Sequence, residues 1–431
     1  MKAIAFSIWL FINLVCFGMC GYIYLLWSQY WNYITKQQKL TAQETPKVDN
    51  RPLVDYFQEP VPVDMHDVEW RHQELVQLPL RSNSKPRFPN SVKPTEPPKP
   101  VPECYENCDF TESRLQAFKN QLIVRLRRVL HDESNVFRSR DGNPYNVHYK
   151  GTRSSHLGTS QELLCDLMKS VPRLRTIDGK SRPFSETGLG DSVPRVPLFA
   201  PQEHYNNCAI VSSAGSLKGS NLGPLIDSND VVLRFNHAPT EGYDDDVGTK
   251  TTIRILNSQV VSKPEFNFLY SPMYRDIKLL AWDPSNYTSS LEQWFMNPDF
   301  DIFTPYMKHR QMNPDTNTHI LDPRDLWKLW DYLQAHTPVR IRKNPPSSGF
   351  LGLVLLLPYC SYINMYEYIP TVRLTNLCHY FDEVNDPSCT FGAWHPLSAE
   401  KLLALALNRA SDRSVFQTGF ITIPGYQNDS C

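Results

Sequence analysis

The clearest chemical signal in the sequence is the stretch 208–257, which joins two short apolar runs through a turn that contains glycine. The apolar runs are 209–212 and 231–235, and the turn spans 213–223. A strand, a turn, a helix and a second strand in this order form half of a βαβ unit. Such a unit places a helix amino terminus beside the end of a strand, where free N–H groups and the helix dipole favour an anion.

The glycine spacing narrows the kind of anion. Gly215, Gly219 and Gly223 fit neither the G-x-G-x-x-G dinucleotide pattern nor a Walker A loop, because no Gly-Lys-Ser/Thr follows. NAD and ATP are therefore disfavoured as ligands. A glycine-bearing turn alone is a weak signal, and an ordinary connection between a strand and a helix remains an alternative.

A second candidate anion site lies in the segment 344–360, NPPSSGFLGLVLLLPYC. Proline in a first helical turn, two serines and a long apolar run predict a buried helix whose start offers unpaired N–H groups. The run is too short, and too interrupted by Pro358, to cross a membrane.

The elements that must position these segments alternate between strands and helices. We expect buried strands at 252–256, 279–282 and 364–369 and a helix at 323–335. This alternation predicts a layered α/β architecture.

The amino-terminal part has a different character. Residues 3–27 are almost wholly apolar and carry no charge, which predicts a transmembrane signal anchor. We expect residues 1–8 to form a short cytoplasmic tail and the start of this anchor. A cleaved signal peptide is the alternative. Residues 28–108 are rich in proline and predict an extended stem, and a domain is expected at 109–431.

Cysteines and glycosylation sequons bear on the compartment. Eight of the ten cysteines follow the apolar span, an even number that suits disulfides in an oxidising compartment better than a metal site. Asn286 and Asn428 begin N-x-S/T sequons, and use of either would place the domain in a lumen. The net charge of −1 gives no reason to expect a nucleic-acid partner.

Four blocks together resemble the large, small, third and very small sialylmotifs of the animal sialyltransferases, in the same order. They are 208–257, 345–369, 379–382 and 395–400, and the resemblance covers about residues 160–431. SSAGSLKGSNLGPLID, LRFNHAPT and NPPSSG are most similar to the β-galactoside α-2,6-sialyltransferases. The resemblance implies a Rossmann-like, mostly parallel sheet flanked by helices, a variant of the glycosyltransferase A fold. It also implies a single-pass type II protein of the Golgi membrane with a lumenal catalytic domain.

The implied reaction is transfer of sialic acid from CMP-sialic acid to the 6-hydroxyl of galactose in Galβ1-4GlcNAc, with inversion. His395 matches the family's base, and imidazole suits that role because its ordinary pKa lies near neutral pH. Glu400 matches the acidic residue of the same motif, where it would orient the site or tune its charge. A helix-start carboxylate with no role in the reaction is the alternative for Glu400.

The resemblance also assigns binding residues. The following residues match positions that line the CMP site in the family: Ser213, Asn236, Asn257, Trp282, Asp283, Ser347, Ser348, Gly349 and His379. The residues that it assigns to the acceptor are Gln259, Asp299, Trp394 and Lys401. Trp394, Phe300 and His379 stand where tyrosine is common in the family, so GalNAcβ1-4GlcNAc remains open as an acceptor.

The same resemblance implies disulfides that join Cys208 to Cys360, Cys378 to Cys389 and Cys165 to Cys431. Cys104 and Cys108 stay unassigned, and a homodimer remains open.

Residues 244–246 form an Asp-Asp-Asp run that could hold Mn²⁺ against a diphosphate, but CMP carries one phosphate, so we expect neither a metal site nor a cofactor. Two other functions compete: a membrane-tethered glycan-binding protein without catalysis, and a metal-dependent UDP-sugar transferase.

Overall fold

The computed structural model describes residues 112–136, 142–154, 158–385, 394–428 and 431. The chain divides into two units, Met1–Asn83 and Ser84–Cys431, and every described residue belongs to the second unit. The anchor expected at 3–27, the stem at 28–108, and Cys104 and Cys108 lie outside the described residues. None of the described helices combines the length and apolar character needed to cross a lipid bilayer.

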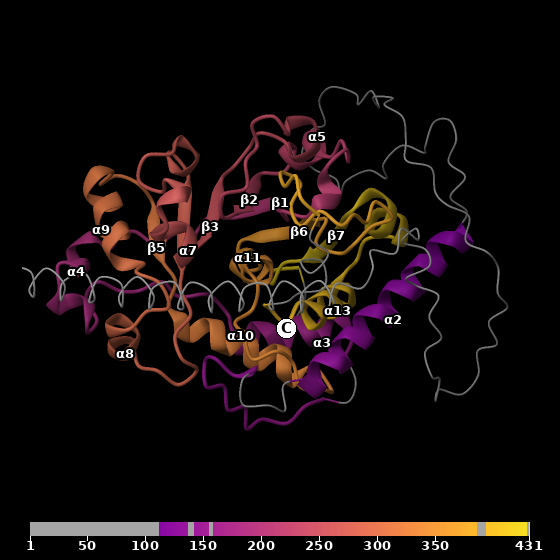
Figure 1. Ribbon diagram of the computed structural model, residues 1–431, viewed down its shortest axis with the longest axis horizontal. Helices are drawn as coiled ribbons and strands as arrows, with labels where there is room; N and C mark the ends of the chain where they lie inside the picture. Colours follow the sequence, from indigo (N-terminus) through magenta and orange to yellow (C-terminus); the bar gives the residue numbers. More distant parts are fainter. Residues whose placement is uncertain (1–111, 137–141, 155–157, 386–393, 429–430) are drawn as a thin grey trace, which may run out of the picture. The chain divides into compact units, whose positions relative to one another are not determined.

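The core is a seven-stranded sheet in the order β5-β4-β3-β2-β1-β6-β7 (Figure 1). The strands are β1 Tyr205–Val211, β2 Val231–Phe235, β3 Ile253–Asn257, β4 Lys278–Trp282, β5 Thr318–Ile320, β6 Cys360–Tyr366 and β7 Phe420–Pro424. Neighbours from β5 to β6 pair in parallel, and β7 alone pairs antiparallel, with β6. The predicted α/β fold with a mostly parallel central sheet is therefore confirmed.

Helices cover both faces of this sheet. The helices are α2 Glu112–Val136, α3 Ser160–Ser170, α4 Leu189–Ser192, α5 Gly223–Asp227, α6 Asp244–Val247, α7 Ser258–Ser262, α8 Leu291–Met296, α9 Phe303–Met312, α10 Pro323–Ala335, α11 Ser348–Leu356 and α13 Leu397–Leu407. In β1, Cys208 and Ile210 pack in one apolar cluster with α11, whereas Ala209 and Val211 pack in another with α5. A parallel strand buried on both faces needs apolar residues in succession, which is the pattern seen in the sequence.

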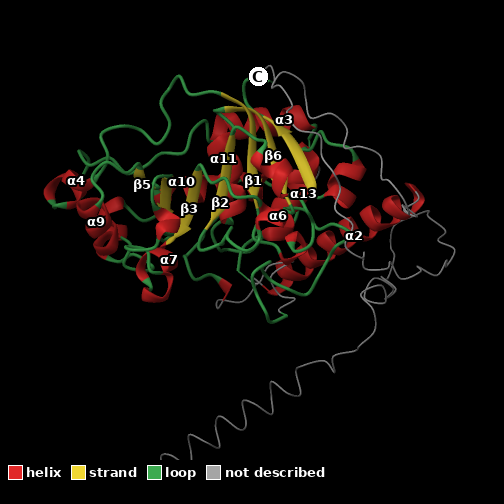
Figure 2. Cartoon of the chain, turned by 90° about the horizontal axis from the view of Figure 1, so that it is seen from above, coloured by secondary structure: helices red, strands yellow, loops and turns green. Residues whose placement is uncertain are grey.

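The order of the strands reverses between β1 and β6, and we use the word crevice for the carboxyl-end edge of the sheet around this point. The chain runs outward from β1 to β5 and then returns to place β6 on the other side of β1 (Figure 2). At such a reversal, the connections that leave the carboxyl ends of neighbouring strands diverge to opposite faces. Doubly wound sheets bind ligands at this edge, and Asn236, Asn257 and the start of α11 lie at it.

The segment after β1 is a long turn followed by a short helix, as the sequence predicts. Gly215–Leu217 forms a single 3-10 turn, and α5 begins only at Gly223 and lasts five residues. Gly219 and Asn221 have φ values of 75° and 54°, which right-handed helix does not accommodate. The predicted order of strand, turn, helix and strand is therefore confirmed, although the helix is only five residues long.

Two disulfides confirm predicted pairs. Cys208 is bonded to Cys360 and Cys165 to Cys431. The first bond joins β1 to β6, the two strands that flank the crevice. Cys378 is also disulfide-bonded, and its expected partner Cys389 lies outside the described residues.

Candidate active site

Two asparagines lie at the ends of neighbouring strands at the crevice. Asn236 directly follows β2 with a φ of 48°, and its Oδ1 accepts a hydrogen bond from the N–H of Asn257, the last residue of β3, at 3.0 Å. Asn257 Oδ1 accepts from the Val260 N–H at 3.0 Å, which caps α7. Both amide oxygens thus bind backbone donors, which leaves the two Nδ2 groups as donors for a ligand. The structure narrows the expected donor-and-acceptor role of these side chains to donation.

The unusual backbone of Asn236 is held by a buried arginine. Arg254 Nη1 donates to the carbonyl oxygens of Asn236 and Ala238 at 2.9 and 3.0 Å. Burial lowers the pKa of Arg254 to about 10, so the guanidinium is still charged at neutral pH. Arg254 therefore fixes the turn that presents the Asn236 amide.

The start of α11 supplies a second set of donors. Ser347 caps the helix by accepting from the Phe350 N–H at 3.2 Å. A Cβ on Gly349 would lie 2.7 Å from the Tyr368 ring, so this position needs glycine. The first N–H groups of a helix have no partner within the helix, and α11 directs them to the crevice end of the sheet.

Trp282 joins the end of β4 to α11 and to the expected base. Its Nε1 donates to Ser348 Oγ at 3.1 Å, and its ring centroid lies 6.5 Å from that of His395. Trp282 is also the register partner of Asn257 across β3 and β4. The expected residues on β2, β3, β4 and α11 therefore form one contiguous row.

His395 is held in one tautomer by a backbone contact. Its Nδ1 lies 2.8 Å from the carbonyl oxygen of Pro345. Because a carbonyl oxygen only accepts, Nδ1 must carry the hydrogen, and in the neutral ring Nε2 then has a lone pair. The half-buried imidazole is thus oriented as a general base through Nε2.

Glu400 is fully buried and binds the same segment. Its Oε1 accepts from the Ser347 N–H at 2.7 Å, and its Oε2 accepts from Ser347 Oγ at 2.5 Å and from Tyr368 Oη at 2.8 Å. His395 and Glu400 therefore both hold the residues 345–347, one through a carbonyl and the other through a serine. This geometry favours an orienting role for Glu400.

The loop after β1 lies against the third motif. Tyr380 donates its N–H to the Ser213 carbonyl at 3.1 Å, and Ala214 forms an isolated bridge with His379. His379 Nδ1 lies 2.8 Å from Asp382 Oδ2. Cys378, His379 and Asp382 have the spacing of a metal site, but a cysteine in a disulfide offers no thiolate ligand.

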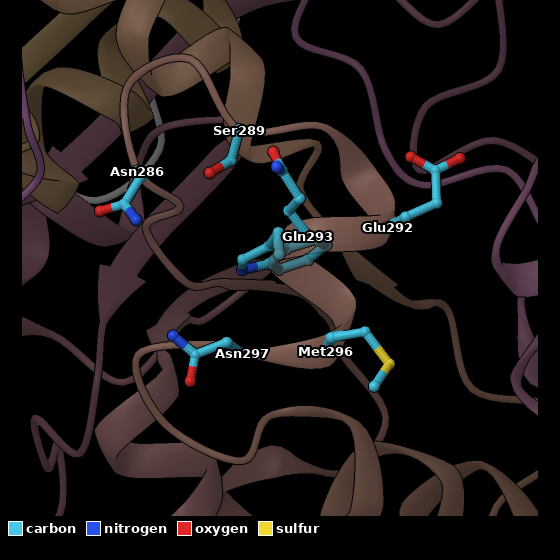
Figure 3. Close-up of a pocket in the computed structure, with 7 residues that line it drawn as sticks. Asn286, Ser289, Glu292, Gln293, Met296 and Asn297 are labelled. Atoms are coloured by element: carbon cyan, nitrogen blue, oxygen red, sulfur yellow. The ribbon is translucent and has the colours of Figure 1, made fainter.

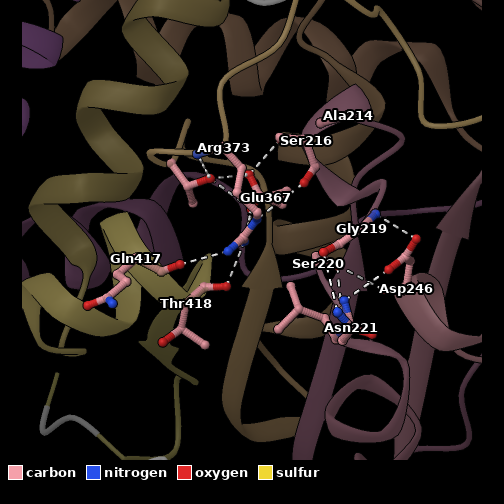
Figure 4. A network of polar contacts seen from close by, with 12 residues as sticks. Ala214, Ser216, Gly219, Ser220, Asn221, Asp246, Glu367, Arg373, Gln417 and Thr418 are labelled. Atoms are coloured by element: carbon pink, nitrogen blue, oxygen red, sulfur yellow. Dashed lines mark hydrogen bonds and ion pairs between the residues drawn. The ribbon is translucent and has the colours of Figure 1, made fainter. Parts of the chain in front are cut away.

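The same loop is fastened to β6 by a network that sequence reasoning missed (Figure 4). Glu367 accepts from Ser216 Oγ at 2.7 Å and from Arg373 Nη2 through its carboxylate. Ser212 Oγ donates to the Glu367 carbonyl at 3.0 Å. These contacts hold the residues on either side of Ser213.

One carboxylate of the acidic run 244–246 has a structural role. Asp246 accepts from the N–H groups of Gly219 and Asn221 at 2.7 and 2.9 Å (Figure 4). This contact explains how the left-handed residues after β1 are held in place.

Asp283, expected at the donor site, is fully buried. Its carboxylate accepts from Trp294 Nε1 at 2.8 Å and from the N–H groups of Asp299 and Phe300 at 2.9 and 3.2 Å. Burial raises the pKa of Asp283 to about 6 although these hydrogen bonds oppose the shift. Asp283 thus positions the loop that carries Asp299.

The expected acceptor residues fall into two groups. Gln259 and Asp299 are exposed and lie near one another, because Lys263 contacts both Gln259 Oε1 and the ring of Phe300. Trp394 is 74% exposed beside the base. Lys401 is buried instead, and its Nζ donates to the Tyr368 carbonyl at 2.6 Å.

An open groove of about 480 Å³ lies beside α8 (Figure 3), and its lining residues include none of the row on β2, β3, β4 and α11. It is lined by Asn286, Ser289, Glu292, Gln293, Trp294, Met296 and Asn297.

The asparagines of both sequons, Asn286 and Asn428, are exposed.

Comparison with known proteins identifies the family. Residues 190–411 match glycosyltransferase family 29 (sialyltransferase), which is more than half of the chain. The chain belongs to this family. The family 29 match contains the large, small and very small motif residues that the structure brings to the crevice.

Curated relatives extend the match. The chain is 45% identical over 290 residues to "Beta-galactoside alpha-2,6-sialyltransferase 2" of Gallus gallus and 47% identical over 290 residues to the protein of the same name of Homo sapiens. Each alignment covers 67% of this chain and 54% of the relative. The chain therefore spans about half the length of the curated relatives that it matches.

A solved structure, "Crystal Structure of a Mammalian Sialyltransferase in complex with Gal-beta-1-3GalNAc-ortho-nitrophenol", is 19% identical. The alignment covers 62% of this chain and 93% of that chain with a TM-score of 0.33. A TM-score this low supports no argument about the site.

Three site features gave no sequence signal. Tyr368, Arg254 and the carbonyl of Pro345 act through contacts between segments that are far apart in the chain. Sequence spacing does not predict such contacts.

Proposed function

We propose that this chain transfers sialic acid from CMP-sialic acid to the 6-hydroxyl of galactose in Galβ1-4GlcNAc on glycoprotein glycans, with inversion. The observation that carries the proposal is the identity of 45–47% to relatives named as β-galactoside α-2,6-sialyltransferases. The oriented imidazole of His395 supports it, because the reaction needs a base at that edge of the sheet.

The donor side would stabilise the departing phosphate without a cation. As the bond between the anomeric carbon and the phosphate oxygen breaks, negative charge develops on CMP. The Nδ2 groups of Asn236 and Asn257 and the N–H groups at the start of α11 are preorganised donors for that charge. Ser348 Oγ accepts from Trp282, which leaves its own hydrogen available for the ligand.

The acceptor step would use His395. Nε2 takes the proton of the sugar 6-hydroxyl as the oxygen attacks the anomeric carbon on the face opposite CMP, which gives inversion. The Pro345 carbonyl stabilises the resulting imidazolium because Nδ1 remains hydrogen-bonded to it. Glu400 acts indirectly, by holding Ser347 through a hydrogen bond.

For the acceptor we propose binding by Trp394, Gln259 and Asp299. An exposed indole offers an apolar face to a sugar ring, and amide and carboxylate groups pair with sugar hydroxyls. GalNAcβ1-4GlcNAc is the second candidate acceptor, because Trp394 and Phe300 replace the phenols common in the family.

We propose that the reaction needs no cofactor and no metal. A single phosphate develops less charge than a diphosphate, and the neutral donors at the crevice match it.

We also propose a lumenal site of action behind a Golgi membrane anchor. The disulfides Cys165–Cys431 and Cys208–Cys360 support this location, because such bonds persist in oxidising compartments.

A transfer assay tests the proposal. The full chain is incubated with CMP-sialic acid and either Galβ1-4GlcNAc or GalNAcβ1-4GlcNAc, with and without EDTA, and the product linkage is assigned by NMR. We expect a 2,6-linked product that EDTA does not reduce. Binding of the acceptor without transfer would instead support the inactive glycan-binding alternative, and loss of transfer in EDTA would contradict metal independence.

A further inference from the structure

Tyr368 lies two residues beyond β6, at the point where the order of the strands reverses. Its neighbour Glu367 contacts the loop after β1 through Ser216, whereas Tyr368 contacts α11 and α13. The end of β6 therefore holds both sides of the crevice through two consecutive residues.

The hydroxyl, the carbonyl and the ring of Tyr368 each have a partner on the α11 and α13 side. Its Oη donates to Glu400 Oε2 at 2.8 Å, and its carbonyl accepts from Lys401 Nζ at 2.6 Å. Its ring occupies the space where a side chain at position 349 would lie. The residue is 5% exposed, so solvent has little access to replace these contacts.

The Tyr368 hydroxyl is linked to the donor site through one side chain, that of Glu400. Glu400 accepts from Ser347 N and Oγ, and Ser347 caps α11. Without the hydroxyl, Oε2 would retain only the Ser347 Oγ contact. A buried carboxylate that loses one of its donors becomes more costly to keep in place, so its hold on the start of α11 weakens.

We propose that Tyr368 is a positioning residue of the donor site, which holds Glu400 so that Glu400 fixes Ser347 and the start of α11. The inference rests on the proposed function, because it takes the start of α11 as the place where the CMP phosphate binds. Tyr368 touches no reacting atom in this scheme.

The chain offers a matched control in Tyr366, two residues earlier. Tyr366 is 1% exposed, and its hydroxyl accepts from Asn229 Nδ2 at 3.2 Å and donates to the Leu225 carbonyl at 3.4 Å. Tyr366→Phe and Tyr368→Phe thus each remove one buried, hydrogen-bonded phenol hydroxyl near the carboxyl end of β6. Only Tyr368→Phe removes a contact to Glu400.

The test measures KM for CMP-sialic acid, KM for the galactoside and the dissociation constant of CMP alone for the full chain and both variants. We expect Tyr368→Phe to raise the donor KM and the CMP dissociation constant about 10-fold, with the acceptor KM unchanged. Tyr366→Phe should stay within about twofold of wild type in all three, although its melting temperature falls comparably.

A coupling measurement separates positioning from general destabilisation. Ser347→Ala and Tyr368→Phe act on the same carboxylate, so the double variant should lose less CMP affinity than the product of the single losses. Multiplicative losses would overturn the inference, as would equal kinetics of Tyr368→Phe and Tyr366→Phe in a protein that transfers sialic acid. A wild-type chain that neither binds CMP nor transfers would overturn the proposed function and this inference together.

Discussion

The proposed donor side and the proposed acceptor side of the crevice are built in different ways. On the donor side, Asn236, Asn257 and Ser347 each have their oxygen bound to a backbone N–H, and they sit at the ends of buried elements. On the acceptor side, Trp394 and Gln259 are exposed and make few polar contacts. The difference suggests that small changes on the donor side should cost much, whereas the acceptor side should tolerate replacement and set preference.

The largest effect is expected at the base, where the two sides meet. His395→Gln should lower kcat by about 10²- to 10⁴-fold, because glutamine does not accept the hydroxyl proton at neutral pH. CMP affinity should stay near wild type, as measured by calorimetry. His336→Gln is the control, because His336 Nδ1 makes a similar contact, 2.9 Å from the Tyr332 carbonyl, far from the crevice along α10. Near-full turnover in His395→Gln would show that the base is misassigned.

The titration of Lys401 tests whether this residue is buried in the core or belongs to the exposed acceptor side. The resemblance assigns it to the acceptor, yet it is buried, and burial lowers its pKa to about 8, opposed by the charges of Glu400 and Glu367. Between pH 8 and the ordinary lysine pKa the unfolded chain binds the extra proton, so stability rises with pH across that window.

Relative to Lys401→Met, the free energy of unfolding of the wild type should rise by up to about 3 kcal/mol from pH 8 to 10.5. Denaturant unfolding at each pH checks this. Parallel pH profiles would mean that Lys401 titrates as an exposed lysine does.

Asn236→Asp tests the donor side with almost no change in shape. The carboxylate still accepts from the Asn257 N–H, but the group that faces the ligand becomes an anion. We expect the KM for CMP-sialic acid to rise about 10- to 100-fold through repulsion of the phosphate and loss of a donor. Asn120→Asp on α2 adds the same charge elsewhere and should leave the donor KM unchanged. Equal behaviour of the two variants would remove Asn236 from the site.

The smallest effect is expected at Trp394. Trp394→Ala should raise the acceptor KM about 3- to 10-fold through loss of the aromatic face, with the donor KM unchanged. Trp394→Tyr should restore most of the affinity. A rise in donor KM instead would place Trp394 on the other side of the crevice.

Much of the fold could be predicted from apolar periodicity. The expected strand 231–235 and helix 323–335 have the bounds of β2 and α10, because each is an apolar pattern with clear boundaries in the sequence. β5 has three residues, which is too short for a recognisable pattern, and β7 was not expected although it has five residues. The helix expected after the turn 213–223 is α5, which lasts only five residues, and the left-handed residues Gly219 and Asn221 belong to the turn itself.

The site residues that could be named from sequence lie at strand ends and helix starts. There local rules decide geometry, as they do for Asn257 and Ser347, which both cap helices. Burial of Lys401 and the contact between Tyr368 and Glu400 depend on how α13 packs against the end of β6. That packing joins segments more than thirty residues apart and is visible only in the structure.

The central claim is that neutral donors at the ends of β2 and β3 and at the start of α11 bind the CMP phosphate beside His395. A crystal structure of the protein with CMP tests this most directly. The account predicts phosphate oxygens within about 3.2 Å of Asn236 Nδ2, Asn257 Nδ2 or the first N–H groups of α11. Nucleotide bound in the groove beside α8, or clasped by a divalent cation, would contradict it.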